Sequence, residues 1–171
     1  MTSATDLLLD AFSRVREEVH GAAEGLNADD LAVRLDPDAN SIGWLLWHLT
    51  RVQDDHIAGV AGREEVWVAG GWAETFALPD GVDGIGYGHT SEQVGLVSGF
   101  DAALALAYYD AVHQQTVAFL RGLDDDELDR VVDENYDPPV TVGVRLVSVI
   151  SDCLQHAGQA AFVAGVLERR H

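Results

Sequence analysis

One apolar stripe near the end of the chain constrains its fold more than any other feature of the sequence. Between residues 142 and 167, side chains on this stripe recur at alternating steps of four and three residues: Val142, Leu146, Val149, Cys153, His156, Ala160, Val163 and Leu167. This spacing places side chains on one face of a helix, and such a long stripe is typical of a seam in a helical bundle. The segment 141–169 is therefore predicted to be a long helix packed against others.

Three further segments predict long helices. Residues 3–26 carry an apolar stripe with the same alternation of steps. Ser41 is placed to cap a second helix that runs to about residue 59, and residues 100–121 are predicted to form a third long helix. The glycine-containing segment 62–90 lacks a period and indicates a long crossover that contains at most a short helix. Capping boxes begin short helical turns at Thr90 and Asp124, and we find no strand-like alternation. We predict an all-α four-helix bundle with a long crossover between helices two and three, in a single domain spanning residues 1–171.

Charge excludes several classes of partner. The chain has 29 acidic and 10 basic residues, a formal charge of −19, which disfavours nucleic acids and anionic membranes because phosphates would be repelled. A single cysteine, Cys153, excludes an internal disulfide and cysteine-rich zinc motifs. Without a signal peptide or a spanning apolar segment, we expect a cytoplasmic protein that binds neither nucleic acid nor membrane.

The candidate site arises from polar residues at seam positions. His156 lies on the apolar stripe, and Asp152 lies one turn before it, so that both side chains project toward one point. His48 lies beside the apolar stripe of the second helix in the same way. We predict that His48, Asp152 and His156 bind one divalent metal and leave coordination positions open. Two alternatives stay open: Asp152 and His156 form a hydrogen-bonded pair that fixes helix register, or His48 is a buried histidine with satisfied hydrogen bonds.

Other candidates are treated separately. His56 lies eight residues beyond His48, about 12 Å along a helix, so the two cannot bind the same ion. Arg145 precedes Asp152 by two turns and is a candidate catalytic residue that grips a carboxylate, with a solvated flank as the alternative. We assign Cys153 to the core. The remaining histidines, His20, His89, His113 and His171, are assigned to surface or loop positions.

The segments SIGWLLWHLTRVQDDHIAG (41–59) and SVISDCLQHAGQAAFVAGVL (148–167) resemble the DinB superfamily, in particular its mycothiol-dependent branch, which includes maleylpyruvate isomerase. The resemblance covers nearly the whole chain in helix order. It implies a DinB-like four-helix bundle that holds zinc or nickel through His48, Asp152 and His156, and it implies a homodimer. Asp152 stands where that branch often has glutamate, which would place the metal nearer the last helix.

These observations together predict a metal-dependent S-transferase. A cation at the site would lower the pKa of a low-molecular-weight thiol, with mycothiol as the co-substrate, and the thiolate would attack a small electrophile. Asp152 would offset metal charge, and Trp67 and Trp72 of the crossover could cover the pocket. The alternatives are a metal-dependent hydrolase, in which the ion activates water, and a non-catalytic, stress-associated metal-binding bundle.

Overall fold

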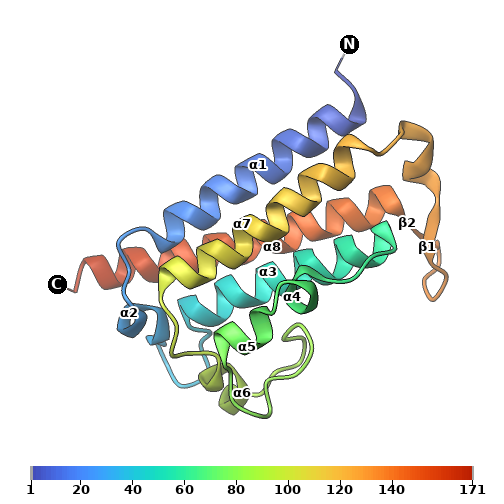
Figure 1. Cartoon of the computed structure of the whole chain (residues 1–171). Helices are drawn as coiled ribbons and strands as arrows, with labels where there is room; N and C mark the ends of the chain where they lie inside the picture. The colour runs from blue at the N-terminus through green and yellow to red at the C-terminus, as the bar shows by residue number, and fades with distance from the viewer. Residues whose placement is uncertain (1, 171) are drawn as a thin grey trace.

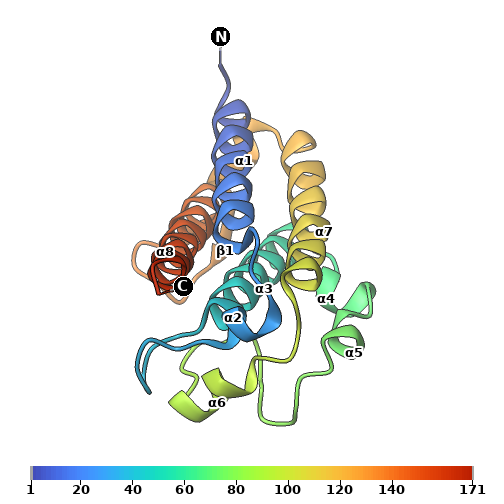
Figure 2. The same ribbon diagram turned by 90° about the vertical axis from the view of Figure 1, so that its left-hand side faces the viewer.

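Four long helices lie side by side in the computed structural model, which describes residues 2–170 (Figure 1). They are α1 (Ala4–Ala23), α3 (Ile42–Ala61), α7 (Ala102–Arg121) and α8 (Val142–Glu168). Both α1 and α3 pack against α7 and α8, so α1 and α3 occupy opposite corners of the bundle (Figure 2). The predicted all-α bundle is confirmed. Within residues 2–170, none of the helices combines the length and apolarity that a membrane span requires.

The long crossover joins α3 to α7 and contains three short helices, α4 (Val66–Ala69), α5 (Trp72–Phe76) and α6 (Ser91–Leu96). It returns the chain to the end of the bundle at which α3 began, so α7 runs parallel to α3 while α8 runs antiparallel to it (Figure 1). The lack of a period in residues 62–90 predicted this crossover between the second and third long helices. The crossover contains more short helices than were predicted.

Buried polar side chains fasten the start of the crossover to the bundle. The carboxylate of Asp54, a side chain that is 1% exposed, accepts hydrogen bonds from the backbone N–H groups of Val66 (2.8 Å) and Trp67 (2.7 Å). It also accepts one from the Tyr108 hydroxyl on α7 (2.8 Å). Because buried carboxylates are stable only when they are hydrogen-bonded or paired, this network ties α3, α4 and α7 together.

The apolar stripe of α8 follows the predicted alternation except at one position. Ala157 is buried, whereas His156 lies beside the seam with its side chain 19% exposed. The step from Cys153 to Ala157 and on to Ala160 is four and three residues, so Ala157 continues the stripe as well as His156 would, without burying a polar ring. Cys153 is fully buried, with its Sγ directed at the Leu49 carbonyl oxygen (3.5 Å). Burial raises the pKa of the Cys153 thiol.

Helix starts follow the predicted capping signals. The side chains of Ser41 and Thr90 accept hydrogen bonds from backbone N–H groups in the first turns of α3 and α6, and Asp124 begins a 3₁₀ helix, η1 (Asp125–Asp129). The Thr141 side chain caps α8 in the same way, a cap that was not predicted. Helix α1 ends at Ala23, earlier than predicted. The sequence analysis missed α2 (Ala28–Ala32), although Asn27 and Asp30 form a capping box.

Two short strands, which were not predicted, accompany the helices. Strands β1 (Val131–Asp133) and β2 (Val140–Thr141) pair in antiparallel fashion between η1 and α8. Three and two residues are too few to show a period of two in a sequence, so alternation could not reveal these strands. The hairpin matters to the site because it places Asp133 beside the first turns of α8.

Candidate metal centre

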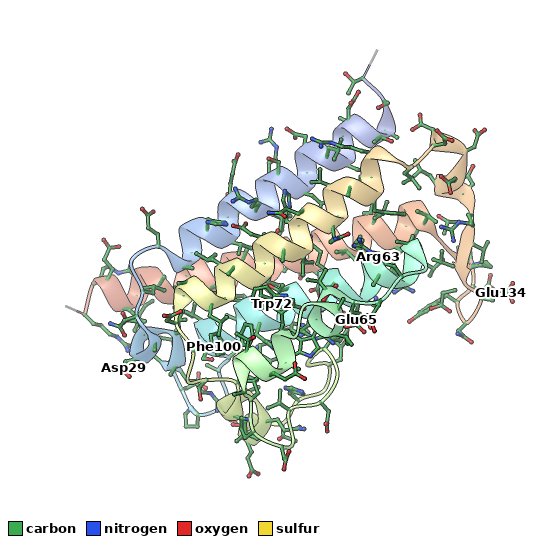
Figure 3. All side chains as sticks on the ribbon, in the orientation of Figure 1. Asp29, Arg63, Glu65, Trp72, Phe100 and Glu134 are labelled. Carbon is green, nitrogen blue, oxygen red and sulfur yellow. The ribbon has the colours of Figure 1, made fainter. Side chains whose placement is uncertain are left out.

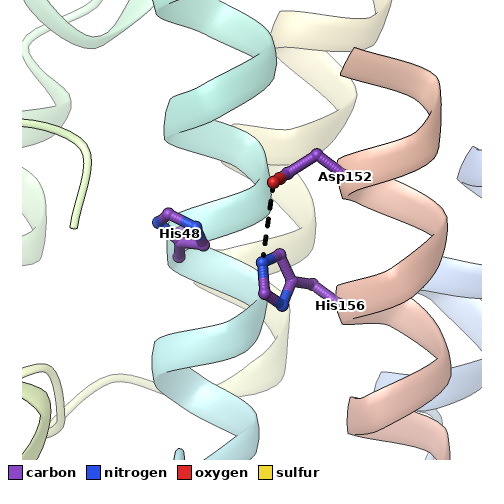
Figure 4. Close-up of side chains that lie close together, drawn as sticks. All are labelled: His48, Asp152 and His156. Carbon is purple, nitrogen blue, oxygen red and sulfur yellow. Dashed lines mark ion pairs between the residues drawn. The ribbon is translucent and has the colours of Figure 1, made fainter. Parts of the chain in front are cut away.

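His48, Asp152 and His156 meet between α3 and α8 (Figure 4). One potential ligand atom from each residue lies within 4.8 Å of the other two. The step of four residues along α8 stacks Asp152 and His156 on adjacent turns, with 3.7 Å between Asp152 Oδ1 and His156 Nε2. His48 approaches from α3, and the centroids of the two imidazole rings are 4.8 Å apart. The structure therefore brings together all three residues that the sequence predicted.

Both imidazoles are oriented by hydrogen bonds at Nδ1. His48 Nδ1 contacts the Ile85 carbonyl oxygen (2.5 Å), and His156 Nδ1 contacts Gln159 Oε1 (3.0 Å). Each partner atom is an acceptor, so Nδ1 carries the proton in both rings and the lone pair is left on Nε2. Proteins commonly fix metal-binding histidines in this way.

The protonation state of His48 also suits a metal ligand. Its side chain is only 2% exposed. Burial lowers the pKa of His48, partly opposed by the hydrogen bond to the Ile85 carbonyl. The ring is therefore neutral at neutral pH, as coordination requires, since a metal competes with protons for the imidazole nitrogen.

One carboxylate oxygen of Asp152 has no partner within residues 2–170. Its Oδ2 atom is buried and has no hydrogen-bond partner. A buried carboxylate oxygen is stable when it is hydrogen-bonded or bound to a cation, and two imidazole nitrogens with a carboxylate oxygen form a donor set that suits zinc, nickel and similar divalent ions. The residues present fit a divalent cation.

A loop of the crossover, residues 83–89, closes over His48. Gly86 has a φ of 97°, and an ideal Cβ on it would lie 2.7 Å from His48 Nδ1. Only glycine therefore lets the backbone come close enough for the adjacent Ile85 carbonyl to bond His48. His89 fastens the same loop, because its Nδ1 accepts a hydrogen bond from Trp44 Nε1 (3.2 Å) and its ring stacks on Trp47.

Tyr87 is the crossover side chain nearest to the site. Its ring meets the His48 ring edge-on, with 5.4 Å between centroids, and its side chain lines the groove that adjoins the three ligands. Partial desolvation and the negative charge of Asp152 raise the pKa of Tyr87. The sequence analysis missed Ile85, Gly86 and Tyr87; the glycine-rich stretch around them was the available signal.

The interpretation of Trp67 and Trp72 as a cover for the pocket was wrong. Trp67 packs on Tyr108 and on the guanidinium of Arg51, and Trp72 packs on Tyr108. Glu65, just before α4, accepts a hydrogen bond from the Arg51 side chain of α3. Glu65 and Trp72 are labelled in Figure 3. These side chains belong to the buried network that holds the crossover against α7.

A groove of about 660 Å³ opens beside Asp152 and runs along α8 toward its beginning. Val52, Val144 and Val147 give it an apolar wall, while Ser148, Ser151 and Gln155 add polar groups. Arg145 and His56 also line this groove, so both candidates lie outside the metal centre but within the same depression. As predicted, His56 does not share an ion site with His48 among the described residues.

The other histidines have separate environments. His20 was assigned to the surface, yet its Nε2 lies 2.9 Å from Asp110 Oδ1 across the α1–α7 interface. His113 is half-buried on α7, and burial lowers its pKa. His89 lies in the crossover loop, as predicted, and His171 lies outside the described residues.

The sequence matches the model of the DinB superfamily over residues 11–160. The chain belongs to the DinB superfamily. A solved structure agrees: a conserved protein from Enterococcus faecalis is 30% identical to this DinB-superfamily protein, with a TM-score of 0.87 over 96% of each chain. Among proteins with curated descriptions, none matches the chain.

Proposed function

We propose that this DinB-superfamily protein is a divalent-metal-dependent S-transferase that joins a low-molecular-weight thiol to a small electrophile. The observation that carries the proposal is that one possible ligand atom each from His48, Asp152 and His156 converges beside an open groove, where a buried Asp152 oxygen has no hydrogen-bond partner among the described residues. Zinc or nickel is the proposed ion, and mycothiol is the proposed co-substrate because of the sequence resemblance described above. A cation held there supplies positive charge that lowers the pKa of a thiol placed beside it.

The charge of the ligand set favours a thiol over water as the activated group. Neutral His48 and His156 leave a divalent charge intact, whereas Asp152 reduces the net charge of the centre by one. A thiol, with an ordinary pKa of about 8.5, needs a small shift to ionise at neutral pH. Free water, with a pKa of about 15.7, needs a much larger shift, although zinc-bound water can reach a pKa of about 7. A thiol is thus the easier of the two groups to ionise at such a site.

The protein's own residues supply orientation and space. Ile85 and Gln159 fix the two imidazole rings, so the ligand atoms are held before any substrate arrives. The groove beside Asp152 accommodates a small molecule, and we assign Arg145 to contact a carboxylate of the electrophile there. No dedicated proton acceptor is needed once the thiol has ionised.

Metal-dependent hydrolysis is the second candidate, because two histidines with one carboxylate also form the ligand set of several zinc hydrolases. Such enzymes use an additional group as a general base toward water. The groove offers His56, which is bonded to Asp55 (3.1 Å) but lies two helical turns from His48. That separation favours the transferase.

Metal analysis of protein purified without a histidine tag tests the site. We expect about one equivalent of a divalent ion in the wild type and loss of that ion in His48→Ala. His20→Ala, which removes a histidine paired with Asp110 on the α1–α7 interface, is the matched control and should retain the metal. Unchanged metal content in His48→Ala would refute the site assignment.

Turnover tests the reaction. The metal-loaded protein should conjugate monochlorobimane to mycothiol faster than the metal-stripped protein does. Cleavage of ester or amide substrates without added thiol would favour the hydrolase instead. Retained metal with neither activity would leave the non-catalytic, stress-associated bundle as the better description and would refute the transferase.

A further inference from the structure

Two polar side chains, Arg145 and His56, line the far end of the groove. Arg145 precedes Asp152 by seven residues on α8, and His56 follows His48 by eight residues on the antiparallel α3. At the rise of an α-helix, these steps are about 10 Å and 12 Å, so the two side chains lie at the same level, away from the metal centre. Both line the main groove and a smaller adjoining cavity of about 250 Å³.

Each of these side chains is held by its own carboxylate. Arg145 Nη2 donates to Asp133 Oδ2 (3.1 Å), and Asp133 is itself fixed through Oδ1 by the backbone and side chain of Asn135. His56 Nδ1 lies 3.1 Å from Asp55 Oδ2. This hydrogen bond lowers the pKa of Asp55. Within residues 2–170, Asp133 engages one donor of Arg145, which leaves other guanidinium N–H groups, and His56 Nε2, for a ligand.

The groove between the two ends is apolar. Val52 forms its inner wall, while Val144 and Val147 are 51% and 61% exposed along its rim. A ligand that fills this space therefore presents a reacting end to the metal centre, an apolar stretch to the valines and a polar end to Arg145 and His56. The order of these three zones sets both the length and the polarity of the ligand.

The charge of the groove residues indicates which chemical group the polar end of the ligand carries. Arg145 is the one permanently charged cation among the groove residues of the described chain. A planar guanidinium with several free donors matches a carboxylate and binds it by two parallel hydrogen bonds. An imidazole beside it can add a further hydrogen bond.

We propose that the groove selects small molecules whose carboxylate lies about 10 Å from the atom held at the metal centre, with Arg145 and His56 binding that carboxylate. This inference rests on the proposed transferase for the identity of the reacting end, and it names the substrate class of the same site. The carboxylate belongs either to the electrophile or to a thiol other than mycothiol, which has no carboxylate group.

The first experiment measures binding by isothermal titration calorimetry to the zinc-loaded protein. The probes are 8-mercaptooctanoate, 8-mercaptooctanol and 3-mercaptopropionate, which share a thiol but differ in charge or length. We expect 8-mercaptooctanoate to bind about tenfold or more tightly than either comparator, since hydrogen bonds to charged groups are stronger than neutral ones. Arg145→Gln should abolish this preference. Arg14→Gln removes an arginine that is paired with Asp10 on α1 in the same manner and should retain it.

A second arm identifies the source of the carboxylate. Octanoate is titrated into zinc-loaded protein with 2-mercaptoethanol already present. Arg145-dependent octanoate binding supports the subsite and assigns the carboxylate to the electrophile. Arg145-dependent binding of 8-mercaptooctanoate alone supports the subsite and assigns it to the thiol.

The result that overturns the proposal is equal binding of 8-mercaptooctanoate and 8-mercaptooctanol, or a preference that Arg145→Gln leaves unchanged. Because binding is measured without turnover, the outcome is independent of the monochlorobimane assay. A protein that selects the long acid but shows no transfer would refute the proposed function alone. A protein that shows transfer but no acid preference would refute the carboxylate subsite alone.

Discussion

Replacing Gly86 by alanine tests whether the crossover loop controls the metal centre. The added Cβ would lie 2.7 Å from His48 Nδ1 and 3.1 Å from the Trp47 ring, closer than van der Waals contact allows. Both rings are buried and cannot retreat, so the loop must move and the Ile85 carbonyl must leave His48. Losing a partner that orients a metal-binding histidine typically weakens metal affinity about 10- to 100-fold. The left-handed backbone adds about 1–2 kcal/mol of destabilisation for alanine.

Gly88→Ala separates the steric effect from the backbone effect. Gly88 also has a positive φ, 73°, but an added Cβ there would meet nothing within 4 Å. We expect both variants to lose about 1–2 kcal/mol of unfolding free energy in urea without metal, with a further loss in Gly86→Ala. Zinc affinity, measured by competition with a chromophoric chelator, should fall only in Gly86→Ala. Equal zinc affinities for the two variants would refute the role of the Ile85 contact.

Two further predictions concern other parts of the bundle. Asp54→Ala leaves the first two backbone N–H groups of α4 and the Tyr108 hydroxyl without an acceptor. Urea denaturation should therefore show a loss of about 3–6 kcal/mol in the free energy of unfolding. A loss below about 1 kcal/mol would contradict the anchoring role of Asp54. Burial lowers the pKa of His113 below the ordinary histidine value of about 6.5, so the unfolded chain takes up a proton first. The contribution of neutral His113 to stability is therefore lost as pH falls through about 6.5. In metal-free protein, His113→Gln should lose less stability than the wild type between pH 7.5 and 5.5; identical losses would argue against this cause.

Long-range architecture was readable from the sequence because each long helix carries its own signals. The stripe of α8, the Ser41 cap and the glycine-containing crossover predicted the long helices and their connection. The three residues that converge at the candidate metal centre were also predicted, since a histidine and an aspartate one turn apart on α8 and a histidine beside the α3 stripe stand out among apolar neighbours. Helical spacing fixes such relations before any tertiary contact is known.

What the sequence hid depends on contacts between distant segments. Ile85 reaches His48 through a backbone carbonyl, which has no residue signature, and the need for Gly86 arises only when the loop lies against α3. The same holds for Asp133, which a two-strand hairpin brings to Arg145. On α8 itself, periodicity could not choose between His156 and Ala157, because adjacent residues fit the same alternation; the packing of α3 against α8 decided it.

The buried position of Cys153 makes its reactivity a measure of how often α3 and α8 separate. The thiol is buried between α8 and the Leu49 carbonyl of α3, one residue from Asp152 of the candidate metal centre. A thiol-specific reagent such as Ellman's reagent reaches that sulfur only when the two helices part, so the rate of labelling reports how often they separate. Because the chain has no second cysteine, all of the labelling reports on Cys153, and no engineered label is needed. An ion bound to both α3 and α8 would hold the helices together and slow the labelling.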